Sequence, residues 1–283
     1  MQLNQLKIKV QHPLFFDVVN IMNCKKNIFF TLFLAFASPL AVHGKTNSAI
    51  GIYEDTYVMQ TATNQINQAV YDEAYDNKVD GLNNSEVKFQ FSLSAPLHGK
   101  GRHALMLSYT QLSLWQLGNT QASSPFRETN YKPQIFMMHQ GNWFAFNNIE
   151  YGYRHQSNGG EINITRSWDR AFITLERVNE RVTYGIQWWH VLKDSENPDI
   201  SDFIPPYELS FGYNGSLLSW KVKGAYNFET DKGQAELGAS IPLNQFLDIY
   251  AQVFTGYGES LIDYNYDQTR LGIGLKLIPA AIR

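Results

Sequence analysis

The sequence is poor in cysteine, in charge and in long hydrophobic runs. Its one cysteine, Cys24, has no second cysteine to pair with, which excludes an internal disulfide bond. Only 17% of its 283 residues are charged and the formal net charge is −3, so the charge balance gives no reason to expect a nucleic-acid partner. Outside the N-terminal region, no apolar run approaches the roughly 18 residues that a membrane-spanning helix needs.

Aromatic residues, by contrast, are abundant. They make up 14% of the chain, with 16 tyrosines, 18 phenylalanines and 6 tryptophans, although the mean hydropathy is only −0.30. A membrane protein has this composition when it is a β-barrel, because apolar residues that face lipid alternate with polar residues that face the lumen.

The N-terminal region has the features of a secretory signal peptide. Within residues 1–44, two lysines precede an apolar stretch that ends in small residues. Because a signal peptide normally begins at the N-terminus, Met22 is expected to be the true start. The alternative is an N-terminal anchor helix. Residues 45–283 then form the mature domain, which contains no cysteine.

Runs of alternating apolar and polar residues recur along the mature chain. In residues 86–94, EVKFQFSLS, every second residue is apolar, and 247–255 and 269–277 repeat the pattern. Comparable runs lie at 51–60, 103–115, 132–140, 142–157, 167–178, 181–192, 206–214, 217–227 and 233–241. About a dozen strands, each with one apolar face, favour a transmembrane β-barrel. The alternative is a soluble β-sandwich or barrel with a packed core. Residues 59–84 lack the alternation and are interpreted as a loop.

Residues 151–160, YGYRHQSNGG, place a histidine and a serine on one face of a strand. Arg154 has the opposite parity, so His155 and Ser157 are expected to face lipid. A hairpin turn near Ile162 would place Asp169 opposite His155 on that face. A hydroxyl, an imidazole and a carboxylate together have the chemistry of a nucleophile, a general base and an orienting acceptor. The alternative is a solvated hairpin end above the bilayer.

Several longer segments resemble the bacterial outer-membrane phospholipase A family over nearly the whole mature chain. They are EVKFQFSLSAPL (86–97), SYTQLSLWQL (108–117), SSPFRETNYKPQIF (123–136), HQSNG (155–159), RSWDR (166–170), NPDI (197–200) and GYGESLIDYNYDQTR (256–270). The resemblance implies a twelve-stranded antiparallel transmembrane β-barrel in the outer membrane. It also implies an active site on the outer face of the barrel, which is where the strand parity independently places His155 and Ser157.

The resemblance assigns roles to four residues. Ser157 corresponds to the nucleophile, and His155 to the general base. The family has an asparagine as the third member, where this sequence has Asp169; either side chain can accept a hydrogen bond from the imidazole. The main-chain N–H of Gly159 corresponds to the family's oxyanion donor.

Calcium is the cofactor that the resemblance implies. The matching ligands are the carbonyl of Gly160, the hydroxyl of Thr165, and Ser123 of the partner subunit. The family has an arginine and a serine where Gly160 and Thr165 stand, but a carbonyl survives any side-chain change and threonine keeps the hydroxyl. A further site of the single-subunit form would include Glu196; the acidic residue that the family pairs with it is here Ile162.

Family activity depends on a homodimer, and Gln111 is the expected interface residue because its parity points its amide into lipid. The predicted function is calcium-dependent hydrolysis of sn-1 and sn-2 acyl esters of phospholipids and lysophospholipids. The alternative is a non-enzymatic outer-membrane porin or structural barrel. One feature fits poorly, because barrels of this class usually end in an aromatic residue, and this chain ends in PAAIR (279–283).

Overall fold

The computed structural model describes the chain in four stretches: residues 50–74, 81–120, 123–160 and 164–278. They belong to one compact unit, Ala49–Arg283. The expected signal peptide, the C-terminal PAAIR and Ile162 lie outside the described residues. None of the helices in the described stretches is long and apolar enough to span a membrane.

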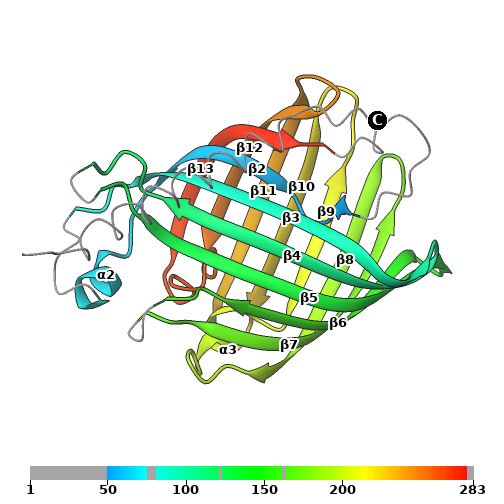
Figure 1. The fold of residues 1–283 in the computed structure, drawn as a ribbon, viewed down its shortest axis with the longest axis horizontal. Coiled ribbons are helices and arrows are strands. Elements are labelled where there is room, and N and C mark those ends of the chain that lie inside the picture. Colours follow the sequence, from blue (N-terminus) through cyan, green and yellow to red (C-terminus); the bar gives the residue numbers. More distant parts are fainter. Residues whose placement is uncertain (1–49, 75–80, 121–122, 161–163, 279–283) are drawn as a thin grey trace, which may run out of the picture. The chain divides into compact units, whose positions relative to one another are not determined.

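Twelve long antiparallel strands form a closed ring (Figure 1). They are β2 Thr56–Thr63, β3 Ser85–Lys100, β4 His103–Trp115, β5 Phe126–Trp143, β6 Phe146–Ser157, β7 Ser167–Val178, β8 Val182–Lys193, β9 Tyr207–Tyr213, β10 Ser219–Asn227, β11 Lys232–Pro242, β12 Leu247–Gly256 and β13 Gln268–Leu277. Pairing of β13 with β2 closes the ring, and a two-residue strand, β1 (Gly51–Ile52), pairs with β3. The predicted twelve-stranded barrel is confirmed, and the β-sandwich alternative is wrong because this ring has no open edge.

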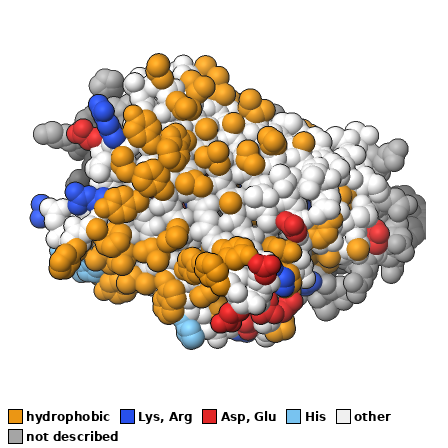
Figure 2. All heavy atoms as spheres, turned by 180° about the vertical axis from the view of Figure 1, so that it is seen from behind, with side chains coloured by type: hydrophobic (Ala, Val, Ile, Leu, Met, Phe, Trp, Pro, Cys, Tyr) orange, Lys and Arg blue, Asp and Glu red, His pale blue; other side chains and the backbone are white. Residues whose placement is uncertain are grey.

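Apolar residues cover the outside of the ring. On β13, Leu271, Ile273 and Leu275 are exposed, whereas Arg270 is buried in the lumen. Figure 2 shows hydrophobic side chains spread over much of the outer surface on the side seen there. An apolar outer surface around a polar lumen is typical of a barrel that is surrounded by lipid.

The two ends of the barrel differ. The connections after β2, β4, β6, β8 and β12 are long, and they include two short helices, α2 (Gln68–Ala74) and α3 (Ile200–Phe203). The strands at the opposite end are joined by tight turns. We call the end with the long connections, on which α2 lies at the left of Figure 1, the loop end. The sequence predicted only a loop over 59–84, but β2 continues to Thr63 and α2 follows it.

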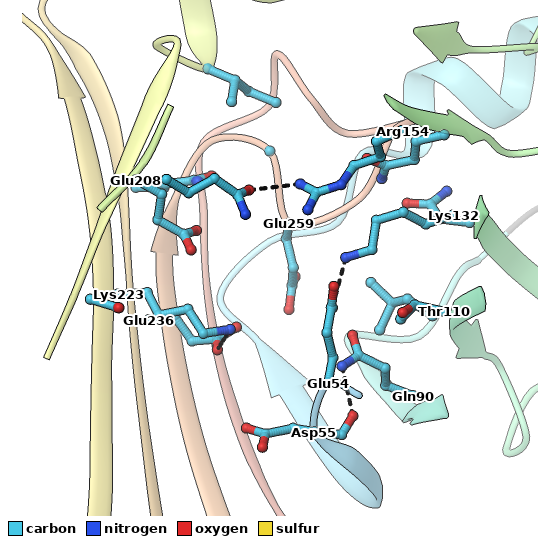
Figure 3. Close-up of a pocket in the computed structure, with 18 of the residues that line it drawn as sticks. Glu54, Asp55, Gln90, Thr110, Lys132, Arg154, Glu208, Lys223, Glu236 and Glu259 are labelled. Atoms are coloured by element: carbon cyan, nitrogen blue, oxygen red, sulfur yellow. Dashed lines mark hydrogen bonds and ion pairs between the residues drawn. The ribbon is translucent and has the colours of Figure 1, made fainter. Parts of the chain in front are cut away.

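A cavity of about 480 Å³ remains in the lumen, lined mostly by charged and polar side chains (Figure 3). The segment that follows β1 helps to fill it, because Tyr53 donates a hydrogen bond to Glu150 at 2.6 Å. The next residue, Glu54, pairs with Lys132 at 2.7 Å. The lumen therefore differs from the water-filled channel of a porin.

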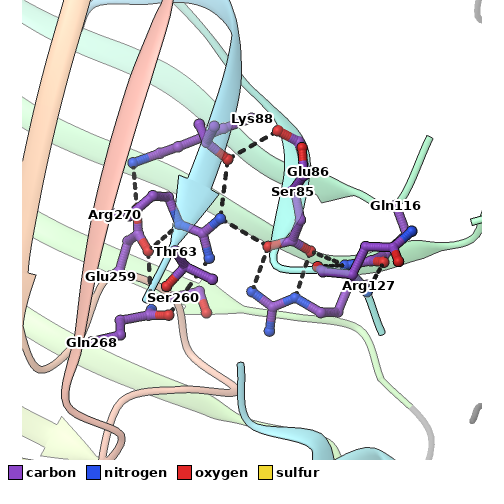
Figure 4. Close-up of polar contacts among 12 residues, drawn as sticks. Thr63, Ser85, Glu86, Lys88, Gln116, Arg127, Glu259, Ser260, Gln268 and Arg270 are labelled. Carbon is purple, nitrogen blue, oxygen red and sulfur yellow. Dashed lines mark hydrogen bonds and ion pairs between the residues drawn. The ribbon is translucent and has the colours of Figure 1, made fainter. Parts of the chain in front are cut away.

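A buried ion-pair network fills the lumen beside this cavity (Figure 4). Its pairs are Lys88–Glu259 at 2.8 Å, Arg270–Glu259 at 2.7 Å, Arg270–Glu86 at 2.9 Å, Arg127–Glu86 at 2.6 Å and Arg127–Asp263 at 2.7 Å. Glu259 and Asp263 come from the connection after β12, so that connection folds onto the strands and links β3, β5 and β13.

Candidate active site

The register of the β6–β7 hairpin brings the three predicted side chains to one patch of the outer face. His155 lies directly opposite Asp169, and Ser157 lies opposite Ser167. The predicted pairing of His155 with Asp169 is therefore confirmed. Ser157 is the last residue of β6, so the patch lies at the loop end of the barrel.

The imidazole and the carboxylate are hydrogen-bonded. His155 Nδ1 lies 2.6 Å from Oδ1 of Asp169. The Tyr153 hydroxyl donates to the same oxygen at 2.8 Å. The side chains of His155 and Asp169 are 37% and 19% exposed, so the pair is accessible from outside the barrel. Tyr153 was not among the predicted site residues, although its parity and its position two residues before His155 place it on the same face.

Ser157 stands two residues beyond His155 on the same edge of the hairpin. Directly opposed residues on β5 and β7 are Tyr131 and Ser167. Within the described residues, no hydrogen bond joins Ser157 to His155. Because Nδ1 of His155 is engaged by Asp169, Nε2 is the nitrogen left to receive a proton from the serine. Such contacts are often long in a free enzyme and tighten when the substrate binds.

Asn158 holds the loop that follows Ser157. Its Oδ1 accepts hydrogen bonds from the main-chain N–H groups of Gly160, at 3.2 Å, and Arg166, at 2.8 Å. Its Nδ2 donates to the carbonyl of Ile164 at 2.8 Å. The side chain is buried, with 7% of its surface exposed. Asn158 thus fixes both ends of the loop. The sequence indicated only that Asn158 belongs to a turn, because these contacts depend on the folded structure.

Gly159 has the backbone conformation that glycine allows most easily. Its φ is +59°, and a Cβ at this position would lie 3.2 Å from the ring of Tyr131. The N–H of Gly159 makes no hydrogen bond within the described residues. It is therefore free to donate to a ligand beside Ser157.

The predicted calcium ligands lie on three connections at the loop end. Gly160 and Thr165 belong to the connection after β6, Ser123 to the one after β4, and Glu196 to the one after β8. Glu196 is exposed. Its neighbour Asn197 accepts a hydrogen bond from the Ser167 N–H at 3.0 Å, which ties that connection to β7.

Two of these residues present oxygen atoms without a partner. The carbonyl of Gly160 and the hydroxyl of Thr165 make no hydrogen bond within the described residues, so both remain available to a cation. Ser123 adopts a left-handed conformation with φ +60°. Across the described stretches, no three His, Cys, Asp or Glu side chains gather to hold a metal ion. A site here would therefore depend on carbonyls, hydroxyls and water.

Gln111 lies on the outer face of β4 and is only 6% exposed. Its Oε1 accepts a hydrogen bond from Tyr109 at 3.0 Å, and its Nε2 donates to Ser113 at 3.2 Å. Ser113 in turn contacts Thr129 on β5 at 3.1 Å. The amide thus has partners within its own subunit, and its second N–H hydrogen remains for a contact outside it. The interface role of Gln111 stays a prediction.

Comparison with known sequences places the chain among phospholipases. The family described as Phospholipase A1 matches residues 41–277. The chain is 42% identical over 234 residues to a phospholipase A1 from Proteus vulgaris. It is 40% identical over 237 residues to one from Escherichia coli K12. Both alignments cover 80% of this chain and 80% of the relative.

Solved structures agree with the sequence comparison. The outer membrane phospholipase A of Escherichia coli has a TM-score of 0.77 at 39% identity, covering 81% of this chain and 98% of that one. A dimer of the Salmonella typhi outer membrane phospholipase with bound calcium has a TM-score of 0.78 at 36% identity, covering 83% and 94%. The chain therefore belongs to the phospholipase A1 family and is a phospholipase of the bacterial outer membrane.

Proposed function

We propose that the chain hydrolyses the sn-1 and sn-2 acyl esters of phospholipids and lysophospholipids, depends on calcium and acts as a dimer. The observation that carries this proposal is the hydrogen-bonded pair of His155 and Asp169 beside Ser157 on the outer face. Outer-membrane barrels direct their long loops to the cell exterior. The loop end would then lie in the outer leaflet, where an ester bond of a membrane lipid can reach Ser157 from the side.

In the proposed mechanism, Oγ of Ser157 attacks the ester carbonyl while Nε2 of His155 takes the serine proton. Asp169 holds the imidazole through Nδ1 and stabilises the imidazolium that forms. His155 then returns the proton to the leaving alcohol. A water molecule, activated by the same imidazole, releases the fatty acid from Ser157.

The Gly159 N–H is the proposed donor to the oxyanion that develops on the ester carbonyl. Its free hydrogen and its place two residues after Ser157 support this role. A donor that is already fixed in position stabilises developing charge without reorganisation in the transition state. Asn158 positions it through the hydrogen bonds that hold the loop.

Calcium fits the oxygen atoms available beside the oxyanion donor. The carbonyl of Gly160 and the hydroxyl of Thr165 would hold it, with Ser123 of the partner subunit and water completing the shell, because Ca²⁺ takes six to eight oxygen ligands. When bound, the ion would polarise the ester carbonyl. The calcium-bound dimer of the Salmonella typhi enzyme supports this assignment. Glu196 is proposed for a separate site in the single subunit.

Dimer formation would complete the calcium shell, since neither subunit supplies all the ligands. Gln111 is the proposed interface residue, with its remaining N–H hydrogen directed to the partner. Apolar helices and strands gain little from hydrophobic burial in lipid, so a polar contact contributes there. We further propose that residues 1–44 are a signal peptide removed on export, which leaves 45–283 as the mature barrel.

Replacing Ser157 tests the enzyme mechanism. Purified protein in detergent with Ca²⁺ and a fluorogenic acyl ester should lose at least about 10³-fold in rate upon Ser157→Ala, because the nucleophile is removed. Ser167→Ala is the matched control, since Ser167 lies directly opposite on the same face. Equal rates for Ser157→Ala and the wild type would exclude the proposed nucleophile.

Metal removal tests the calcium proposal. EDTA should suppress turnover, and chemical cross-linking should yield a dimer only when calcium or substrate is present. Thr165→Val should raise the calcium concentration needed for half-maximal rate, because it removes the hydroxyl oxygen at nearly constant shape. Thr165→Ser keeps that oxygen and should resemble the wild type. Full activity in EDTA would refute the calcium requirement.

A further inference from the structure

Two arginines face each other in the lumen wall directly behind the candidate active site. Arg154 and Arg170 are cross-strand partners on β6 and β7, and both are 5% exposed. Each is the sequence neighbour of an outward-facing site residue, His155 or Asp169. Like charges directly opposite on paired strands repel each other, so this arrangement needs compensation.

Within the described residues, the compensation comes from amides and aromatic rings. The guanidinium carbon of Arg154 lies 4.5 Å from the centre of the Phe172 ring, and that of Arg170 lies 3.6 Å from the centre of a Trp168 ring. Arg154 donates to the side-chain oxygen of Gln134 at 2.5 Å and to that of Gln187 at 2.7 Å. Arg170 donates to Gln156 at 2.7 Å. Neither guanidinium forms an ion pair in the described stretches, unlike Lys132, which pairs with Glu54 in the same cavity. A buried charge without a counter-charge is costly.

Two buried hydrogen-bond donors near the arginines also lack a partner. They are Nε of Arg170 and Nε1 of Trp189, and the indole is 4% exposed. The guanidinium carbon of Arg170 lies 5.4 Å from the centre of the Trp189 ring. Both side chains, like Arg154, line the 480 Å³ lumen cavity. Two cations without an ion pair and two unused donors thus meet at one wall of a polar cavity.

We infer that this wall of the lumen binds a small tetrahedral oxyanion of the phosphate class, held by Arg154, Arg170 and Trp189. Guanidinium groups match the oxygen atoms of such an anion in pairs of parallel hydrogen bonds, and the indole N–H supplies a neutral donor. The bound anion removes the repulsion between the arginines. It thereby holds β6 against β7 behind His155 and Asp169.

Two carboxylates compete for the same role: Glu54, which is already paired with Lys132, and Glu208. Glu208 lines the cavity from the opposite wall, where Figure 3 shows it facing the side from which Arg154 projects. Glu208 forms no ion pair within the described residues. If Glu208 is the counter-charge of the arginines through water, no anion is required. The two explanations differ in whether phosphate binds to the wild type or only after Glu208 is removed.

Titration of inorganic phosphate into the full-length protein in detergent, without calcium, tests the inference by isothermal calorimetry. The wild type should show one saturable site. Arg170→Gln and Trp189→Phe should each weaken binding, by roughly tenfold or more for the arginine because it loses charge-assisted hydrogen bonds. Lys221→Gln is the matched control: Lys221 lines the same cavity but faces Glu176 at 3.9 Å. It should change the affinity by less than about twofold.

Glu208→Gln separates the explanations when it is compared with the wild type. Saturable phosphate binding by both proteins supports the inference, whereas binding by Glu208→Gln alone identifies Glu208 as the counter-charge and overturns it. Absence of saturable binding to the wild type would overturn the inference. If Lys221→Gln and Arg170→Gln weakened phosphate binding equally, the inference would also be overturned, since phosphate would then be attracted by the overall charge of the lumen and not by a specific site. If Arg170→Gln does not fold, Trp189→Phe decides, because it keeps an aromatic ring at this position and removes the N–H donor.

Discussion

We propose that Asp169 takes the place of the family's active-site asparagine. Its Oδ1 accepts hydrogen bonds from both His155 and Tyr153. These two donors require an acceptor oxygen at this position. The carboxylate of an aspartate and the amide of an asparagine each supply such an oxygen. A structure of the Escherichia coli relative carries an alanine in place of an active-site asparagine. We propose that the role of Asp169 in orienting His155 depends on this oxygen, while its charge is an addition.

Asp169→Asn tests this separation of roles. The variant should keep activity within about tenfold of the wild type, because Tyr153 and His155 both favour the orientation that presents the amide oxygen. Some rate should be lost with the charge, since a neutral amide stabilises the imidazolium that forms during the reaction less than a carboxylate does. The measurement is initial rate against pH with a fluorogenic ester.

Asp169→Ala is the reference for that experiment, because it removes the acceptor as well as the charge. It should lose at least about a hundredfold in rate. An Asp169→Asn variant as inactive as Asp169→Ala would mean that the charge, and not the oxygen, is essential.

At the scale of elements, strand alternation predicted the barrel well. The predicted runs 167–178 and 269–277 differ from β7 and β13 by one residue or less. Each strand has one face in lipid and the other in a polar lumen, so the pattern directly reflects the fold. The same parity predicted the pairing of His155 with Asp169.

The alternation did not predict contacts between residues that are distant in sequence, or segments outside the strands. Asn158 contacts Arg166 across the loop, and Tyr53 reaches Glu150 across the barrel. Helix α2 lies in a polar segment without alternation. Such features arise from specific side-chain geometry, which periodicity does not record.

The loop after β6 should loosen upon Asn158→Ala. The substitution removes the acceptor for two main-chain N–H groups, which costs about 1–3 kcal/mol when the groups stay buried. We therefore expect a rate at least about tenfold lower and a higher calcium requirement, because Gly159 and Gly160 lose their fixed positions. Both are measured in the ester assay with titrated Ca²⁺.

Asn147→Ala is the matched control for the loop. Asn147 makes similar hydrogen bonds to the main chain of Val178, at 2.6 and 2.8 Å, but at the open end of the same hairpin, where the barrel has its tight turns. It should leave the calcium requirement unchanged. Similar calcium curves for the two variants would show that Asn158 does not act through the site.

At the scale of the whole molecule, the candidate active site and the contacts that hold the strands together lie on opposite faces of the barrel wall. The outer face carries the hydrogen-bonded pair of His155 and Asp169, while the lumen contains the ion-pair network that joins distant strands. In lipid, the hydrophobic effect does not compact the barrel, so these internal contacts carry much of the specificity of the packing. Stability of the fold should accordingly depend on the protonation of the network.

Glu259 makes this dependence measurable, because it lies in the connection after β12, outside the strands. Burial alone would raise its pKa, but Lys88 and Arg270 outweigh burial and lower the pKa of Glu259 from 4.5 to about 2. A carboxyl whose pKa is lower in the folded state contributes stability above pH 4.5 and loses it as the pH falls towards 2. The contribution is on the order of 3 kcal/mol.

Glu259→Gln should therefore flatten the decrease in unfolding free energy between pH 4.5 and about 2, the window set by these pKa values. At neutral pH the variant should be less stable, because Lys88 and Arg270 lose a buried counter-charge. Urea unfolding followed by tryptophan fluorescence at several pH values provides the measurement. Glu229→Gln, in the exposed connection after β10, is the matched control and should retain the wild-type slope. A wild-type slope in Glu259→Gln would contradict the assignment of acid sensitivity to this network.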